Sequence, residues 1–428
     1  MNYIICNFEI MKLFILNLLI TGNIFNFVID KTESDYHSIP PILKTVIFKN
    51  NSHQTNLPIL TDNENLELSF DDLSGYENDY YYKISYHNWD WSESNLFKNE
   101  YLNGIDNTRI TNFENSFNTL RRYTNHSLKL PNKSIQLKLS GNYMIHVYNS
   151  NDELQFSRKF LYLKQKIKVT GNVFRTRDLD FFLTHQNIKF EIIQNRIGFI
   201  QNPNENLKVV LIQNDQWFNQ IINLKPQFNE NNVLKYRYDK LSSFEGGNEY
   251  LYFDTKDLRI NGVNTSFINL EEIYHVYLYT DIPRKYNPYS YTQDLNGDFK
   301  IRTVLGTQKS NIEADYSWVY FTLAASIELP ETKIYVLGNF NNYEPSEESL
   351  MVYNKSLEAY EAKILLKQGF YNYKYVGKTI SGWDLNLISG NYFQTENNYK
   401  VLVYYRPPGE IYDQLIGIGE FNSEKILN

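Results

Sequence analysis

The residues able to do chemistry are seven scattered histidines, one cysteine and many dispersed carboxylates. No two histidines stand at the i, i+4 spacing that would place a pair of zinc ligands on one face of a helix. The cysteine, Cys6, lies near the N-terminus, so the remaining chain has no disulfide, thiolate ligand or cysteine nucleophile. The sequence contains no G-x-S-x-G elbow, H-E-x-x-H pair, Walker loop or G-x-G-x-x-G turn. We therefore expect no enzyme, no catalytic residue, no metal site and no cofactor. The histidines are His37, His53, His87, His126, His146, His185 and His275.

One acidic loop could bind calcium. The stretch "DLNGD" (294–298) places Asp294, Asn296 and Asp298 at alternate positions, like the start of a calcium loop. The bidentate Glu that such a loop needs at its twelfth position is missing, because Leu305 stands there. Since an Asn-Gly pair is also typical of a type I′ turn, we favour a turn over a calcium site.

Alternating polar and apolar residues recur along the chain and predict strands rather than long helices. The aromatic content of 16%, with 36 Tyr and 27 Phe, favours half-buried sheets in the same way. The best short helix candidates are 113–120 and 269–276. We therefore predict an all-β fold of consecutive immunoglobulin-like or early-set β-sandwich domains. The clearest predicted strands are 66–70, 80–87, 135–139, 143–148, 188–193, 207–214, 276–281, 299–304, 318–324, 333–338 and 401–406.

The N-terminus resembles a secretory signal, which we place at residues 1–30 with Met11 as the more natural start. The apolar stretch after Met11 is interrupted by Asn17, Asn23 and Asn26, so it is too short and too polar for a comfortable membrane span. A retained membrane anchor is the alternative. We expect a mature protein that is exported and does not itself span the membrane.

Polar joints near 163–169 and 304–315 suggest the domain boundaries. They divide the rest of the chain into three expected β-sandwiches of ordinary domain size, at 31–165, 166–310 and 311–428. The formal net charge of −7 gives no overall cationic field that would attract a phosphate backbone, so we expect no nucleic-acid partner.

A C-terminal stretch, "KIYVLGNFNNYEP" and its continuation to residue 376, resembles glycogen-binding and isoamylase N-terminal modules. The resemblance lies in a strand, a G-x-F-N loop and a strand-Gly-aromatic run. Sugar binding in such modules uses exposed aromatic rings, yet Tyr343 stands where Trp is usual, and Trp383 is the only later tryptophan. A secreted α-glucan-binding protein is therefore one alternative, and a glycoside-acting enzyme with unpaired carboxylates is a weaker one.

Eight collinear blocks resemble the plug protein family of the type IX secretion system, found in Bacteroidetes. The resemblance runs from about residue 44 to 418, and one departure is Asn88, where the family commonly has Cys. It implies a periplasmic protein that docks on a large outer-membrane β-barrel translocon and closes its periplasmic mouth while no substrate is moving. The blocks are 80–96, 116–132, 140–148, 244–259, 291–299, 313–323, 366–376 and 395–417.

The face that would meet the barrel is unknown from the sequence. Aromatic and Arg-rich clusters dominate protein interfaces, so Trp89, Trp91 and the tyrosines of "RKYNPYSYTQD" (284–294) are the candidates. Each has a structural alternative. The alternation in "WDW" would place both indoles on one face, where they would fill a sandwich core, and the Pro in "KYNPYSY" makes that stretch a loop that could simply cover its own domain.

Overall fold

The computed structural model describes residues 39–50, 55–195, 198–307 and 309–427, and these belong to one unit, His37–Asn428. The fold is mostly β, with 46% of residues in strands and 4% in helices, which confirms the all-β prediction. The expected signal at residues 1–30 lies outside the described residues.

The N-terminal sandwich consists of two sheets whose inner side chains share one core, including Leu68, Phe70, Ile84, Tyr143 and Phe156. A short helix, α2 (Lys98–Tyr101), and a two-stranded sheet of β5 (Leu102–Gly104) and β9 (Ile135–Leu137) accompany it. The first sheet, in spatial order, is β1 (Leu43–Asn50), β3 (Leu66–Asp72), β8 (Thr124–Leu130) and β7 (Asn112–Asn115). The second is β2 (Ile59–Leu60), β11 (Leu154–Tyr162), β10 (Gly141–Asn149), β4 (Tyr80–His87) and β6 (Thr108–Arg109).

The middle sandwich combines strands from two distant parts of the chain around a core that includes Phe190, Val209, Phe244 and Val401. One sheet is β12 (Lys168–Arg175), β13 (His185–Ile193), β17 (Val233–Tyr236) and β16 (Phe228–Glu230), with β18 (Ser243–Glu245) also on β13. The other is β15 (Gln220–Ile221), β14 (Leu207–Gln213), β29 (Asn398–Tyr405) and β30 (Gln414–Asn422). Helix α3 (Pro203–Asn206) precedes β14.

The inserted sandwich lies in the chain between β18 and β29, and its core includes Phe253, Phe321 and Tyr373. One group of strands is β19 (Leu251–Asp254), β27 (Gly369–Thr379) and β22 (Phe299–Ile301), with β24 (Lys333–Leu337) and β28 (Gly382–Asp384) also on β27. The other sheet is β20 (Thr265–Leu270), β21 (Tyr274–Leu278), β23 (Tyr316–Ala324), β26 (Ala359–Lys367) and β25 (Val352–Asn354). Helices α4 (Ser310–Glu313) and η2 (Asn339–Asn341) lie in its connections.

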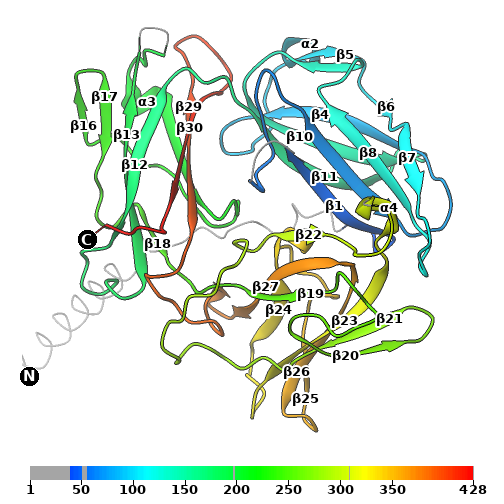
Figure 1. The fold of residues 1–428 in the computed structure, drawn as a ribbon. Helices are drawn as coiled ribbons and strands as arrows, with labels where there is room; N and C mark the ends of the chain where they lie inside the picture. Colours follow the sequence, from blue (N-terminus) through cyan, green and yellow to red (C-terminus); the bar gives the residue numbers. More distant parts are fainter. Residues whose placement is uncertain (1–38, 51–54, 196–197, 308, 428) are drawn as a thin grey trace, which may run out of the picture. The chain divides into compact units, whose positions relative to one another are not determined.

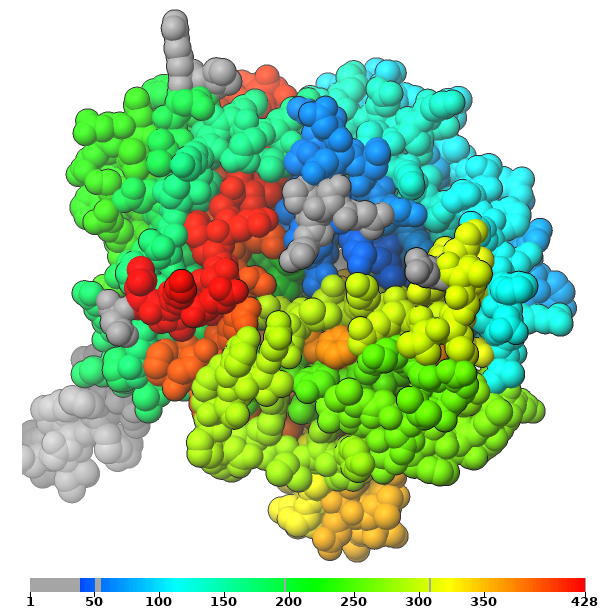
Figure 2. Space-filling model, in the orientation of Figure 1, coloured from blue at the N-terminus to red at the C-terminus, as the bar shows by residue number. Residues whose placement is uncertain are grey.

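Strand pairing divides the chain differently from the cuts that the sequence suggests. β14 pairs with β29 in register, Val210 opposite Leu402, so C-terminal strands complete the middle sandwich, and Figure 1 shows β29 and β30 beside β12 and β13. In Figure 2 the red C-terminal residues accordingly lie among the green residues of this sandwich. The cut at 310 separates β22 from β23, although their side chains Phe299 and Val319 share one core. Alternation identifies which face of a strand is buried, but it does not identify the strand beside it.

Candidate interaction surfaces

Trp89 and Trp91 lie in a turn that follows β4, where Trp91 adopts a left-handed backbone with φ of 68°. Both indoles pack, partly buried, against an apolar cluster shared by the N-terminal and middle sandwiches. The Trp91 ring makes an edge contact with Trp217 at a centroid distance of 4.8 Å, and Lys159 Nζ lies 4.6 Å from the Trp91 centroid. The two tryptophans face the same cluster, so they join two sandwiches and are not a free docking surface. The buried members are Leu57, Ile59, Leu161, Val210, Ile212, Leu402, Tyr404 and Leu415.

The tyrosines of 284–294 have different environments. Tyr286 is 90% exposed. The Tyr289 hydroxyl donates a hydrogen bond of 2.5 Å to Glu249 Oε1, and the Tyr291 hydroxyl donates one of 3.2 Å to Glu396 Oε2. The stretch is a loop, as its Pro predicts, and two of its three tyrosine hydroxyls bind carboxylates of this chain.

Two carboxyl groups, Asp294 at the end of this loop and Glu249, which binds Tyr289, are unusually weak acids. Burial raises the pKa of Glu249 to about 7 and that of Asp294 to about 6. Asp294 accepts hydrogen bonds from the backbone N–H of Tyr250 (2.5 Å) and of Asn296 (2.6 Å), which oppose the rise. Glu249 lies on the connection from β18 to β19, where the chain passes from the middle sandwich to the inserted one. The charged form of Glu249 at this connection is therefore unfavourable near neutral pH.

The "DLNGD" stretch forms a turn. Asn296 and Gly297 both have positive φ, at 52° and 89°, and the Asp298 N–H donates to the Leu295 carbonyl at 3.1 Å. Positive φ at both central positions is the type I′ pattern that the Asn-Gly pair predicts. The Asp298 carboxylate accepts from the Asn339 side chain at 2.8 Å, whereas the donors to Asp294 are the backbone N–H groups of Tyr250 and Asn296.

The two aromatic residues that sugar binding would need are packed on protein. Tyr343 and Trp383 both lie, partly buried, against the cluster of Tyr335, Leu337 and Val376. The Tyr343 hydroxyl donates to the Tyr250 hydroxyl at 3.2 Å, and the Trp383 ring packs on Tyr335 at a centroid distance of 5.5 Å. Contacts within the fold explain both aromatic residues without a carbohydrate.

A buried ion pair joins the N-terminal and inserted sandwiches. Lys367 Nζ, at the end of β26, lies 2.6 Å from Asp71 Oδ2 on β3, and both side chains are 1% exposed. The same Asp71 oxygen accepts a hydrogen bond of 2.6 Å from the Tyr316 hydroxyl, and Oδ1 accepts one of 2.7 Å from Asn125. Lys367 also donates to the Asn311 carbonyl at 2.5 Å. Burial lowers the pKa of Lys367 and raises that of Tyr316. Each charge is satisfied, as a buried pair requires.

A second polar junction connects the N-terminal sandwich to the loop between β29 and β30. Arg406 and Asp413 form a bidentate pair with distances of 2.7 and 3.0 Å. Arg406 also donates to Asn88 Oδ1 at 3.2 Å, and the Tyr86 hydroxyl donates to the Asp413 carbonyl at 2.5 Å. Asn88 is thus one of the residues that bind the loop between β29 and β30 to the N-terminal sandwich.

Two histidines that are distant in the sequence form one hydrogen-bonded chain on β4, β10 and β11. The Trp91 carbonyl can only accept, so His87 Nδ1 donates to it at 3.0 Å and neutral His87 Nε2 accepts from Ser85 at 2.8 Å. Ser85 then accepts from His146 Nε2 at 2.8 Å, and His146 Nδ1 accepts from Ser157 at 2.7 Å. Burial lowers the pKa of both rings, that of His146 to about 4. Both imidazoles are therefore neutral structural groups whose ring nitrogens are all engaged.

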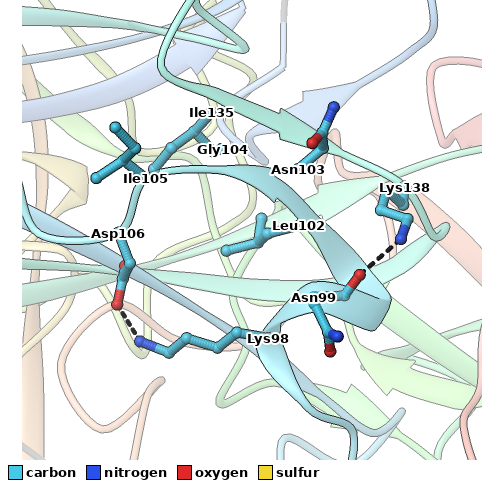
Figure 3. A pocket seen from close by; sticks show the side chains of 9 residues that line it. All are labelled: Lys98, Asn99, Leu102, Asn103, Gly104, Ile105, Asp106, Ile135 and Lys138. Atoms are coloured by element: carbon cyan, nitrogen blue, oxygen red, sulfur yellow. Dashed lines mark hydrogen bonds and ion pairs between the residues drawn. The ribbon is translucent and has the colours of Figure 1, made fainter.

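A hollow of about 350 Å³ lies beside α2 and β5. Figure 3 shows its two lysines turned to protein acceptors: Lys98 pairs with Asp106, and Lys138 Nζ donates to the Asn99 carbonyl at 2.6 Å. In the described ranges, no group of three or more His, Cys, Asp or Glu side chains is placed to hold a metal ion. None of the helices in those ranges combines the length and apolar character that a membrane crossing requires.

The structure reveals an aromatic row, exposed at Phe267 and half-buried at Tyr277 and Tyr320, that sequence reasoning missed. Phe267 lies opposite Tyr277, Tyr277 opposite Tyr320, and Tyr320 opposite Lys363, on four neighbouring strands. The Tyr277 and Tyr320 rings stack at a centroid distance of 4.3 Å, and Phe267 is 55% exposed. The predicted helix at 269–276 is wrong, because these residues form the end of β20, a turn and the start of β21. The signal that could have revealed β20 is the uncharged stretch "TSFINL".

Comparison with known proteins identifies relatives of this chain. The chain is similar to a hypothetical protein from Parabacteroides merdae whose crystal structure is known, with 34% sequence identity and a TM-score of 0.85 over 90% of this chain and 98% of that one. The chain belongs to the same family as this protein. Residues 43–164 match the model of the type 9 secretion system plug protein 1st domain. Among curated proteins, none matches the chain.

The residues that match the plug protein 1st domain model, 43–164, coincide with the N-terminal sandwich, whose strands run from β1 to β11. The match confirms the first part of the sequence resemblance, which extends from about residue 44 to 418. The matched family is a component of protein secretion and not a family of enzymes, and it implies a location in the cell envelope.

Proposed function

We propose that the chain is a periplasmic plug subunit of the type IX secretion system. It docks on the periplasmic mouth of the large outer-membrane β-barrel translocon and closes the pore while no substrate is moving. The single observation that carries the proposal is the plug protein 1st domain at residues 43–164.

The junctions between the sandwiches support this role. A pore that passes proteins would leak small solutes when open, so its stopper must resist deformation. The buried Lys367–Asp71 pair and the Arg406–Asp413–Asn88 group link parts of the chain that are far apart in sequence. Because breaking a buried pair leaves an uncompensated charge, such junctions oppose the separation of the sandwiches.

The test is an affinity purification from detergent-solubilised outer membrane with the chain tagged at its C-terminus. We expect the translocon barrel protein in the eluate in a stoichiometric amount relative to the tagged chain. The same purification from cells that express the untagged chain should recover no barrel protein. Cells that lack the chain should admit small antibiotics that wild-type cells exclude, and the tagged chain should restore the barrier. A chain that recovers no barrel, and whose loss leaves permeability unchanged, would refute the proposal. Retention on immobilised α-glucan would then favour the carbohydrate alternative.

A further inference from the structure

The edge strands of the sheets differ in how well they are protected against pairing with another polypeptide chain. Natural proteins protect edge strands with charges, Pro, bulges or short length. In the described residues β25 and β28 have three residues each, and β7 carries Glu114, which pairs with Lys309. β1 carries lysines and a bulge between Lys44 and Ile47. β20 has a bulge between Thr265 and Phe267, yet its six residues, "TSFINL", include no charge and no Pro.

The side chains along β20 suit contact with another polypeptide. Phe267 is 55% exposed and Leu270 is 53% exposed. Two more apolar residues precede the strand, since Ile260 is 64% exposed and Val263 is 52% exposed. Phe267 also ends the aromatic row of Tyr277 and Tyr320, so an added strand could continue that row across the sheet. Figure 1 shows β20 and β21 at the margin of the inserted sandwich.

The backbone of β20 has one strand neighbour, β21, in the described part of the chain. An edge strand presents the N–H and C=O groups of its other side to any extended chain that approaches. One of these groups, the Ser266 carbonyl, already accepts a hydrogen bond of 2.9 Å from the Asn261 side chain. Strand pairing would therefore begin after Ser266 and run toward Leu270.

The charged residues at the end of β20 indicate which charge a partner would carry beside them. Glu271 and Glu272 follow the strand directly and are exposed, and Glu271 lies 3.4 Å from His275 Nε2. A basic residue in the partner would complement these two carboxylates, whereas an acidic one would be repelled.

We propose that β20 is a strand-addition edge that pairs with an extended, uncharged and apolar segment of the translocon barrel protein, flanked by a basic residue beside Glu271 and Glu272. The added segment forms a sixth strand on the five-stranded sheet of β20, β21, β23, β26 and β25. This inference rests on the proposed function, because it identifies the surface by which the plug holds its barrel.

The test measures backbone hydrogen exchange of the full chain, alone and in complex with the detergent-purified barrel protein. We expect those amides of 267–270 that face away from β21 to exchange about tenfold more slowly in the complex, while the amides of β25 at the opposite edge stay unchanged. The double variant Phe267→Lys/Leu270→Lys should weaken barrel binding by about tenfold or more. Val352→Lys is the matched control, since Val352 is 69% exposed on β25 and should bind like wild type.

The outcomes separate the two proposals. If the complex forms without protection of β20, or if the double variant binds as tightly as Val352→Lys, the inference is wrong and the plug function stands. If no complex forms with the wild-type chain, the proposed function fails and this inference fails with it. If β20 is protected without the barrel, in a dimer that the double variant abolishes, a second copy occupies the edge and the assigned partner is wrong. Should the double variant not fold, the wild-type exchange data decide.

Discussion

The buried Lys367–Asp71 pair allows a quantitative test of how the sandwiches are held together. Replacing Lys367 by Met removes the ammonium but leaves Asp71 buried, with only the Tyr316 hydroxyl and the Asn125 amide as partners. Because both charged side chains are 1% exposed, solvent cannot compensate the remaining carboxylate. Removing one partner of a fully buried pair costs about 3–5 kcal/mol. We therefore expect Lys367→Met to lower the free energy of unfolding by that amount.

A double-mutant cycle isolates the pair. Asp71→Asn/Lys367→Met removes both charges, so its cost should be smaller than the sum of the two single changes by about 1–3 kcal/mol. The control is Lys189→Met, because Lys189 pairs at 2.6 Å with an Asp239 side chain that is 60% exposed. That change should cost about 0–1 kcal/mol. Urea unfolding followed by tryptophan fluorescence measures all four variants. A Lys367→Met cost no larger than that of Lys189→Met, or additive single changes, would refute the reasoning.

Three further predictions concern the connection and the turns. Burial holds the pKa of Glu249 at about 7 in the folded chain, above its ordinary value of 4.5, so the folded state retains a proton that the unfolded state releases. Wild type should therefore lose roughly 2–3 kcal/mol of stability relative to Glu249→Gln between pH 4.5 and pH 7; parallel urea midpoints for the two proteins across this range would contradict the assignment. Gly297→Ala should destabilise the fold by about 1–3 kcal/mol, because φ is 89° and a Cβ there would lie 1.7 Å from the Tyr343 hydroxyl oxygen. An unchanged melting temperature would show instead that the turn relaxes. Trp91→Ala should lower the free energy of unfolding by about 2–4 kcal/mol, because the contact with Trp217 is lost. Tyr286→Ala, at an exposed position, should change it by less than about 0.5 kcal/mol. If thermal unfolding shows the same small change for both variants, the Trp91–Trp217 contact does not stabilise the fold.

Individual strands could be predicted from the sequence, but their neighbours could not. The alternation in "YYYKISYH" predicts 80–87, which is β4, and "LKVVLIQN" predicts 207–214, which contains β14. The alternation of apolar and polar residues shows that one face of each strand is buried, but the same alternation would suit any neighbouring strand. The pairing of β14 with β29 depends on a core that forms from residues on both sides of the inserted sandwich, such as Val209 and Val401. No local pattern contains that information.

The candidate interface residues show the same limit at the level of side chains. "WDW" correctly suggests two indoles on one side, but they follow a turn and pack between two sandwiches, because the second sandwich supplies Trp217 and its neighbours. β20 was missed because "NLEEIYHV" has helix-like spacing. Its glutamates instead form the turn between β20 and β21, in which the Glu271 N–H donates to the Ile273 carbonyl at 3.1 Å. Exposure is a property of the assembled molecule, and the sequence contains it only indirectly.

The late arrival of β29 and β30 in the chain sets an order of assembly. Because synthesis proceeds from the N-terminus, the chain can complete the N-terminal sandwich early, since β1 to β11 are contiguous in sequence. β14 then has β15 beside it but not β29 until the whole inserted sandwich has been synthesised, and only afterwards can Arg406 reach Asn88. Pairing of β29 with β14 is thus the last step in assembling the middle sandwich, and a chain cut short before β29 would leave that edge of β14 open to proteolysis.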